Sequence, residues 1–182
     1  MVYSVKDIAI VCTFTYSQNT RYCANGSANN AETDGFKSMK EAQKRGVLID
    51  VGFAGNVHAD FGILKRAIEN GIIPDIISTD ITRLSAFVRG GRYGMTMCMS
   101  IARKLGMSEE EIFRAVTSKP ASVFGMEDEC GYLREGRSAD IAVFDYTDEP
   151  FELTDKAGNR IAGSVGYRCD LTIVDGEIIY RH

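Results

Sequence analysis

The chain has 182 residues, with 21 basic and 25 acidic side chains and a formal net charge of −4. Hydrophobic residues make up 45% of it, which excludes a disordered chain and is ordinary for a globular one. The mild acidity argues against nucleic acid or an anionic membrane as a partner, because both require a basic face. No apolar run approaches the roughly 20 residues that span a bilayer, and the N-terminus lacks a signal-peptide pattern. The five cysteines are scattered without a CxxC pair, so we expect reduced thiols and a cytoplasmic location.

The chain begins with an apolar, β-branched run over residues 7–14, which is typical of a strand buried on both faces. Residues 15–35 are rich in Asn, Ser, Thr and Gly and predict a long loop. Asp34 is a candidate N-cap for a helix over 36–45, which Gly46 ends. The opening pattern is therefore strand, loop and helix.

Two more apolar runs, at 47–52 and 75–79, predict further strands. Between them lies a helical periodicity over residues 59–70. Its apolar positions are Phe61, Leu64, Ala67 and Ile68. Strands that alternate with helices in this way form parallel sheets with right-handed crossovers.

Two helices are predicted after the third strand. The first covers about 95–105, and its methionines indicate core packing rather than a metal site. The second covers about 109–117, because Ser108 and Glu111 have the spacing of a capping box. Pro120 either ends that helix or starts another turn.

The pattern changes after residue 125, where strand-like runs alternate with Gly and Asp turns. These runs cover 139–146, 169–175 and 177–181. Asp175-Gly176, between the last two runs, is a strong signal for a two-residue hairpin.

Residues 152–163 fit either another hairpin or an exposed loop. The periodicities together predict an α/β domain over 1–125. A β-rich segment follows it over 126–182.

Asp80 is the leading candidate site residue. It follows the predicted strand in PDIISTD, and βα architectures place their chemistry at the carboxyl ends of strands. A carboxylate there can bind a metal or act as a general base. The alternative is a solvated loop residue or the N-cap of the next turn.

His58, Arg89 and Arg92 are candidate substrate-binding residues. His58 lies just after a predicted strand, but a lone His is more often structural, because zinc sites recruit two or more His or Cys ligands. Arg89 and Arg92 flank a Gly pair and could hold an anionic substrate by bidentate contacts. The alternative for them is a mobile basic loop.

Three motifs together resemble the C-terminal half of the metal-dependent amidohydrolases, in the branch with dihydroorotase-like, D-aminoacylase-like and deacetylase-type enzymes. They are the ISTD strand end, the T-x-x-P-A-x-x-x-G join at 117–125, and the G-x-L-x-x-G-x-x-A-D-I-A-V-F-D run at 131–145. The resemblance covers roughly residues 36–182, and more weakly 7–35.

This resemblance implies a (β/α)₈ barrel with a β-sandwich built from both ends of the chain. Residues 7–14, 47–52 and 75–79 would be barrel strands six to eight, and 126–182 the C-terminal part of the sandwich. The implied reaction is metal-assisted hydrolysis of the C–N bond of a small amide or cyclic amide. Asp80 would be the strand-eight carboxylate, which binds zinc or another divalent metal and shuttles a proton.

The chain departs from the family in its metal ligands. The His-x-His of strand one, the Lys of strand four and the His of strand five are absent, and Phe14 and Phe53 stand where His ligands are expected. We therefore expect that the chain binds no metal tightly and is inactive by itself, since zinc needs three or four ligands. The alternatives are a composite active site completed by another chain, or a non-catalytic scaffold.

The sequence also indicates that copies of the chain associate. Three barrel strands without their partners leave open edges and apolar faces, and both features recruit other chains. The sequence therefore predicts a homo-oligomer.

Overall fold

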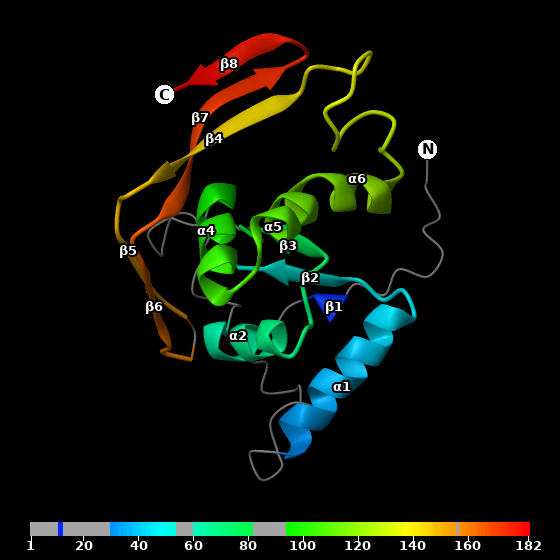
Figure 1. Ribbon diagram of the computed structural model, residues 1–182, viewed down its shortest axis with the longest axis vertical. Coiled ribbons are helices and arrows are strands. Elements are labelled where there is room, and N and C mark those ends of the chain that lie inside the picture. The colour runs from blue at the N-terminus through cyan, green and yellow to red at the C-terminus, as the bar shows by residue number, and fades with distance from the viewer. Residues whose placement is uncertain (1–10, 13–29, 54–59, 82–93, 156) are drawn as a thin grey trace.

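The computed structural model describes residues 11–12, 30–53, 60–81, 94–155 and 157–182. Helices gather around a small parallel sheet, and β-strands of the C-terminal segment lie along one side of them (Figure 1). The helices are α1 (Asn30–Lys44), α2 (Phe61–Glu69), α4 (Met95–Leu105), α5 (Glu109–Val116) and α6 (Ser118–Phe124). The strands are β1 (Val11–Cys12), β2 (Ile49–Gly52), β3 (Ile76–Ser78), β4 (Ile141–Thr147), β5 (Phe151–Thr154), β6 (Arg160–Gly163), β7 (Gly166–Val174) and β8 (Glu177–Arg181).

The first sheet has the order β1-β2-β3, and both pairings are parallel. Val11 pairs with Ile49, and Asp50 pairs with Ile76. The prediction of parallel strands that alternate with helices is thus confirmed for the described residues. Of the predicted strand 7–14, residues 7–10 and 13–14 lie outside them.

The start of the first helix differs from the prediction. Helix α1 begins at Asn30, so Asp34 lies inside the helix and not at its N-cap, and the predicted loop over 15–35 ends earlier. Ala31 and Glu32 are strong helix formers, and they extend the helix back into the segment for which the polar composition predicts a loop.

One face of β2 forms the centre of the hydrophobic core. Ile49, Val51 and Phe53 alternate along the strand, and each is at most 3% exposed. Helix α2 buries Phe61, Leu64, Ala67 and Ile68, the four apolar positions that its periodicity predicts. Since a fully buried side chain of this kind stabilises by about 1.5–3 kcal/mol, the core fixes both helix and strand.

At the amino-terminal end of the parallel strands, one carboxylate links α1, β2 and β3. Asp75, just before β3, accepts a hydrogen bond from the backbone N–H of Ile49 at 3.0 Å through Oδ2. The same oxygen accepts one from Nε2 of Gln43 in α1, also at 3.0 Å. These contacts set the register of β2 against β3 below the strand ends that carry the candidate site.

Helix α5 starts at the predicted capping box. Ser108 accepts a hydrogen bond from the backbone N–H of Glu111, and the Glu111 carboxylate accepts one from the backbone N–H of Ser108. Pro120 lies in the first turn of a separate helix, α6, where its missing N–H costs nothing. The alternative that Pro120 starts another turn is therefore the observed one.

The C-terminal segment is β-rich from Ile141 onward, as predicted. Strands β4, β7 and β8 form an antiparallel sheet in the order β4-β7-β8. Asp175 and Gly176 make the predicted turn between β7 and β8, with φ of 50° and 83°. Positive φ at both positions is the signature of a type I′ turn, which matches the twist of a hairpin.

Residues 152–163, for which the sequence left a hairpin or a loop open, contain the β5–β6 hairpin. Leu153 and Ile161 are 8% and 7% exposed and belong to the core cluster. Asp155, 3% exposed, accepts a hydrogen bond from the backbone N–H of Phe61 at 2.7 Å and from that of Asn159 at 2.8 Å. The Asp155 carboxylate therefore attaches the hairpin to the start of α2.

Strand β7 is joined to α4 and α5. The backbone N–H of Tyr167 donates a hydrogen bond to Oγ of Ser100 at 2.9 Å. The ring of Phe113 meets the rings of Tyr167 and Phe144, with centroids 5.8 and 5.9 Å apart. These contacts fix the inner end of the β4–β7–β8 sheet against the helices.

None of the helices in the described ranges is long and apolar enough to cross a membrane. Cys98, Cys130 and Cys169 form no disulfide.

Candidate functional site

Asp80 lies two residues beyond the end of β3 and is exposed. Its φ is 47°, a left-handed conformation that is uncommon for any residue other than glycine. The sequence prediction that this carboxylate follows the strand's carboxyl end is confirmed.

Gly52, the last residue of β2, makes room for Asp80. A Cβ at Gly52 would lie 2.8 Å from Cβ of Asp80 and 3.2 Å from Oγ of Ser78. Carbon atoms do not approach this closely without something shifting. The absence of a side chain at Gly52 therefore lets the Asp80 side chain lie against the neighbouring strand.

A second carboxylate, that of Asp50, lies on the same face of the sheet. Oγ of Ser78 donates a hydrogen bond to Oδ2 of Asp50 at 3.2 Å. Burial raises the pKa of Asp50, and the negative charge of Asp80 adds to the rise, while the hydrogen bond from Ser78 opposes it. The strand ends thus gather two carboxylates and a hydroxyl. Sequence reasoning missed Asp50 and Ser78, although Asp50 is a half-buried residue between the buried Ile49 and Val51 of β2.

Phe53 lies at the same end of the sheet as Asp80, as predicted, and its backbone N–H donates to the Ser78 carbonyl at 3.3 Å. Its side chain is 0% exposed and packs in the core with Val51 and Phe61. Strand alternation turns Phe53 toward the helices, whereas Gly52 faces the side of Asp50 and Asp80. Phe53 offers no ligand atom and fills the core instead.

His58, Arg89 and Arg92 lie outside the residues that the structure describes. Their proposed role in substrate binding therefore stays a prediction from the sequence.

The described residues at the strand ends do not by themselves suit a zinc ion. They offer two carboxylates and one hydroxyl, whereas zinc is held by three or four Cys, His or carboxylate ligands. Over the described ranges there is no group of three or more His, Cys, Asp and Glu side chains that could hold a metal ion. The arrangement can support proton transfer by a carboxylate.

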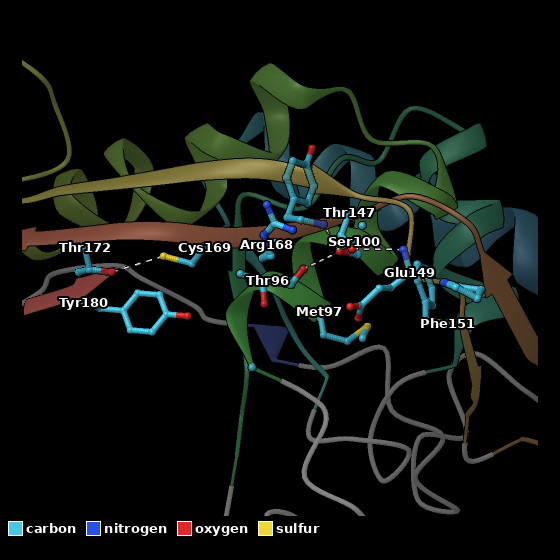
Figure 2. Close-up of a pocket in the computed structure, with 14 residues that line it drawn as sticks. Thr96, Met97, Ser100, Thr147, Glu149, Phe151, Arg168, Cys169, Thr172 and Tyr180 are labelled. Carbon is cyan, nitrogen blue, oxygen red and sulfur yellow. Dashed lines mark hydrogen bonds between the residues drawn. The ribbon is translucent and has the colours of Figure 1, made fainter. Parts of the chain in front are cut away.

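A cleft of about 770 Å³ lies between the N-terminal half of α4 and the strands of the C-terminal segment (Figure 2). Thr96 and Met97 of α4 and Cys169, Thr172 and Tyr180 of β7 and β8 line it. No sequence motif marks this cleft, because it is built from segments that are far apart in the chain.

Several polar groups that line the cleft have partners within the chain. Ser100 donates from Oγ to the Thr96 carbonyl at 2.7 Å. Sγ of Cys169 lies 3.3 Å from Oγ1 of Thr172. The Arg168 guanidinium is paired with Asp170 at 2.8 Å. The cleft therefore lies where α4 packs against the strands, and the Arg168 guanidinium in it is already paired with a carboxylate.

Comparison with known proteins identifies relatives for most of the chain. A family model described as "Amidohydrolase family" matches residues 55–179. A deacetylase of Brucella anthropi is 30% identical over 141 residues, which are 76% of this chain and 34% of that protein. A deacetylase of Enterococcus faecalis is 30% identical over 165 residues, 86% of this chain and 43% of that protein. A dihydroorotase of Anaeromyxobacter dehalogenans is 35% identical over 96 residues, 47% of this chain and 21% of that protein.

Solved structures show the same relationship. The crystal structure of an adenine deaminase superposes with a TM-score of 0.69 and 29% identity, over 88% of this chain and 44% of that one. A dihydroorotase structure superposes with a TM-score of 0.66 and 26% identity, over 87% of this chain and 43% of that one. The chain thus spans about a third to two fifths of the length of the deacetylases that it matches.

Proposed function

The chain belongs to the amidohydrolase family, and on that premise we propose that Asp80 is the acid–base carboxylate of a site for hydrolysing amide or cyclic amide C–N bonds. The observation that carries the proposal is the placement of Asp80. It is an exposed carboxylate with a left-handed backbone at the carboxyl end of a parallel strand, and Gly52 leaves space for it. In barrels of parallel strands that end is the catalytic one.

The chemistry that Asp80 would perform is proton transfer. As a base, its carboxylate takes a proton from the water that attacks the amide carbon, and as an acid it returns that proton to the leaving nitrogen. Breaking an amide requires both transfers, because an unprotonated amide nitrogen is a poor leaving group. The nearby Asp50–Ser78 pair would keep the surroundings of Asp80 polar.

Strands β1, β2 and β3 are proposed to be strands six to eight of a barrel, within a domain over 1–125. Residues 126–182 would be the C-terminal part of a β-sandwich. The parallel order of the three strands and the superposition on an adenine deaminase and a dihydroorotase support this assignment.

Substrate binding is proposed for His58, Arg89 and Arg92, with a small acetylated or cyclic amide as substrate. The names of the relatives, deacetylase and dihydroorotase, support this substrate class. The cytoplasmic location and the lack of a nucleic-acid or membrane partner stay predictions from composition.

We also propose that the 182-residue chain by itself is catalytically inactive, because the family reaction depends on a divalent metal such as zinc. The whole sequence contains two histidines, and the described strand ends offer only carboxylates and a hydroxyl. A site with so few ligands holds zinc weakly.

The test measures bound metal and amide hydrolysis on the same purified chain, grown and assayed with zinc. We expect fewer than about 0.1 metal ions per chain and no turnover of dihydroorotate or of N-acetylated amino acids. One or two tightly bound metal ions with turnover would refute the inactivity of the chain.

Any turnover found must then disappear in Asp80→Asn, which removes the base and keeps the shape of the side chain. The matched control is Asp128→Asn, an exposed carboxylate in the turn after α6. Turnover that survives Asp80→Asn would refute the role of Asp80.

A further inference from the structure

We propose that Asn70 is a site of spontaneous deamidation in this chain, and that the end of α2 around it controls the rate. In this reaction the backbone nitrogen of Gly71 displaces the side-chain amide of Asn70, and a carboxylate replaces the amide. The modification is independent of the proposed function, since neither residue belongs to the strand ends that carry Asp80.

Asn70 and Gly71 form an Asn-Gly pair directly after α2. Asn70 is the exposed C-cap residue of the helix, with φ of −87° and ψ of 8°. Gly71 is exposed as well, and its φ of 74° is a left-handed conformation that glycine adopts readily. Asparagine is a chemically labile residue, and a following glycine has no side chain to shield its backbone nitrogen. Within the described ranges this is the one Asn-Gly pair, and Asn25-Gly26 lies outside them.

The reaction needs only water as a co-reactant. The Gly71 nitrogen gives its proton to solvent, and its electron pair forms a bond to Cγ of Asn70. The bond from Cγ to Nδ2 breaks, and Nδ2 leaves as ammonia after taking a proton from solvent. Water then opens the resulting cyclic imide. Opening at Cγ gives aspartate, and opening at the main-chain carbonyl carbon gives isoaspartate, in which the main chain runs through the side-chain carbons.

Both reacting groups are held by hydrogen bonds at the helix end. The backbone N–H of Gly71 donates to the Ile68 carbonyl at 2.8 Å. Nδ2 of Asn70 donates to the Arg66 carbonyl, also at 2.8 Å. Ring closure requires both bonds to break, because the side chain must turn onto the Gly71 nitrogen. The reaction therefore proceeds from conformations in which the last turn of α2 has opened, and such local opening costs less free energy than global unfolding.

The burial of Ile72 determines how rarely this turn opens. Ile72 is 0% exposed and belongs to a core cluster with Ile49 and Ala67. Its backbone N–H donates to the Ala67 carbonyl at 2.9 Å. Nζ of Lys40 in α1 donates to the Asn70 carbonyl at 3.3 Å. Because these contacts lie on both sides of the Asn-Gly pair, they hold it in the unreactive arrangement.

Both products weaken this end of α2. Aspartate cannot donate to the Arg66 carbonyl, and its negative charge lies at the C-terminal end of a helix, where anions are unfavourable. Isoaspartate adds a carbon atom to the main chain before Gly71. That carbon shifts the N–H groups of Gly71 and Ile72 away from their carbonyl partners. Deamidation of Asn70 therefore destabilises the folded chain.

The experiment compares the whole chain in its folded state and in guanidinium chloride, in the same mildly alkaline buffer. Mass spectrometry of proteolytic peptides follows the conversion of Asn70 with time. We expect the folded chain to convert between about tenfold and a thousandfold more slowly than the unfolded chain, as local opening implies. An unfolded chain in which Asn70 stays intact, or equal rates in the two states, would overturn the proposal. A folded rate below that range would also overturn it, because only global unfolding would then expose Asn70.

Ile72→Ala tests whether the helix end controls the rate. Loss of this buried side chain should make the folded chain convert at least about fivefold faster, while the rate of the unfolded chain stays the same. The matched control is Ile112→Ala, which removes an equally buried isoleucine from α5 and from the other core cluster. It should leave the folded rate unchanged. Equal acceleration in the two variants would overturn control by the helix end.

Lys40→Ala is a second variant, which leaves the core intact and serves if Ile72→Ala does not fold. It removes the hydrogen bond to the Asn70 carbonyl and should raise the folded rate about twofold. Circular dichroism verifies that each variant is folded. A folded rate that neither Ile72→Ala nor Lys40→Ala changes would overturn control by the helix end.

Asn70→Asp reproduces one product and tests its effect on stability. The thermal unfolding midpoint of this variant should lie about 1–4 °C below that of the unmodified chain, because a charge replaces a hydrogen-bond donor at the helix end. A midpoint equal to or above that of the unmodified chain would overturn the destabilising effect of the modification.

Discussion

The two C-terminal hairpins, β5–β6 and β7–β8, arise from similar local signals but differ in what holds them. The β5–β6 hairpin buries Leu153 and Ile161 in the core, and its Asp155 receives three hydrogen bonds. In the β7–β8 hairpin, every residue of β8 is exposed. A turn flanked by alternating residues can form either hairpin. The buried contacts of the β5–β6 hairpin, however, are made with the helices and the core. The C-terminal segment is thus anchored at its short hairpin and at the inner end of β7, while every residue of its outer strand, β8, is exposed.

The largest expected effect is that of Asp155→Ala. It removes the acceptor for the backbone N–H groups of Phe61 and Asn159 and for the Asn159 side chain. Buried donors without an acceptor are costly, so the free energy of unfolding should fall by about 4 kcal/mol. Urea unfolding followed by circular dichroism measures it. Asp148→Ala, at an exposed position between β4 and β5, is the control, and an equal loss there would contradict this expectation.

The next largest loss of stability is expected from a comparison of two isoleucines that differ in burial. Ile161→Ala in β6 should cost about 3 kcal/mol, because the side chain is 7% exposed and leaves a cavity. Ile178→Ala in β8, where the side chain is 54% exposed, should cost less than about 0.5 kcal/mol. Urea unfolding followed by circular dichroism measures both. Similar costs at the two positions would show that β8 is packed in solution.

Tyr167, at the buried end of β7, should show the opposite sign. Its hydroxyl is buried and has no hydrogen-bond partner among the described residues, so Tyr167→Phe should raise the free energy of unfolding by about 1 kcal/mol. Burial also raises the pKa of Tyr167 to about 12, from an ordinary value of 10.0.

The raised pKa adds a pH dependence to this variant. Between pH 10 and about 12 the unfolded chain loses the proton of this phenol while the folded chain keeps it. The free energy of unfolding that this pKa difference contributes below pH 10 is therefore lost as pH rises through this window. The free energy of unfolding of Tyr167→Phe should fall less over the same range. Urea unfolding at pH 8 and at pH 11 measures the difference. A steeper loss in the variant would contradict the burial of the phenol.

The smallest effect belongs to Arg160→Ala. Arg160 pairs with Glu152 across the β5–β6 hairpin at 3.2 Å, but the two side chains are 76% and 60% exposed. Solvent screens such pairs, so only a few tenths of a kcal/mol should be lost. Double-mutant cycles with Glu152→Ala measure the coupling. A coupling near that of the Asp155 contacts would mean that surface charge, not burial, holds this hairpin.

The candidate site was predictable in part. The position of Asp80 follows from an apolar run that ends in a carboxylate, which is a local pattern. The roles of Asp50 and Ser78 were not predictable in the same way, because their 3.2 Å contact joins residues 28 positions apart on two strands. The space at Gly52 is also a property of two strands together, since the atoms that a Cβ would meet belong to Ser78 and Asp80.

The sequence alone determined the order and type of most elements: the strand–helix alternation up to β3, the α5 capping box, and the turn at Asp175-Gly176. These features depend on periodicity, capping and backbone φ preferences, all of which act within a few residues. Only the tertiary structure decided that Phe53 packs in the core while Gly52 faces Asp80, that Asp155 accepts hydrogen bonds at the start of α2, and that the residues of β8 are exposed. The physical reason is that burial and hydrogen bonding between distant segments depend on which faces meet in space, and no local pattern specifies that.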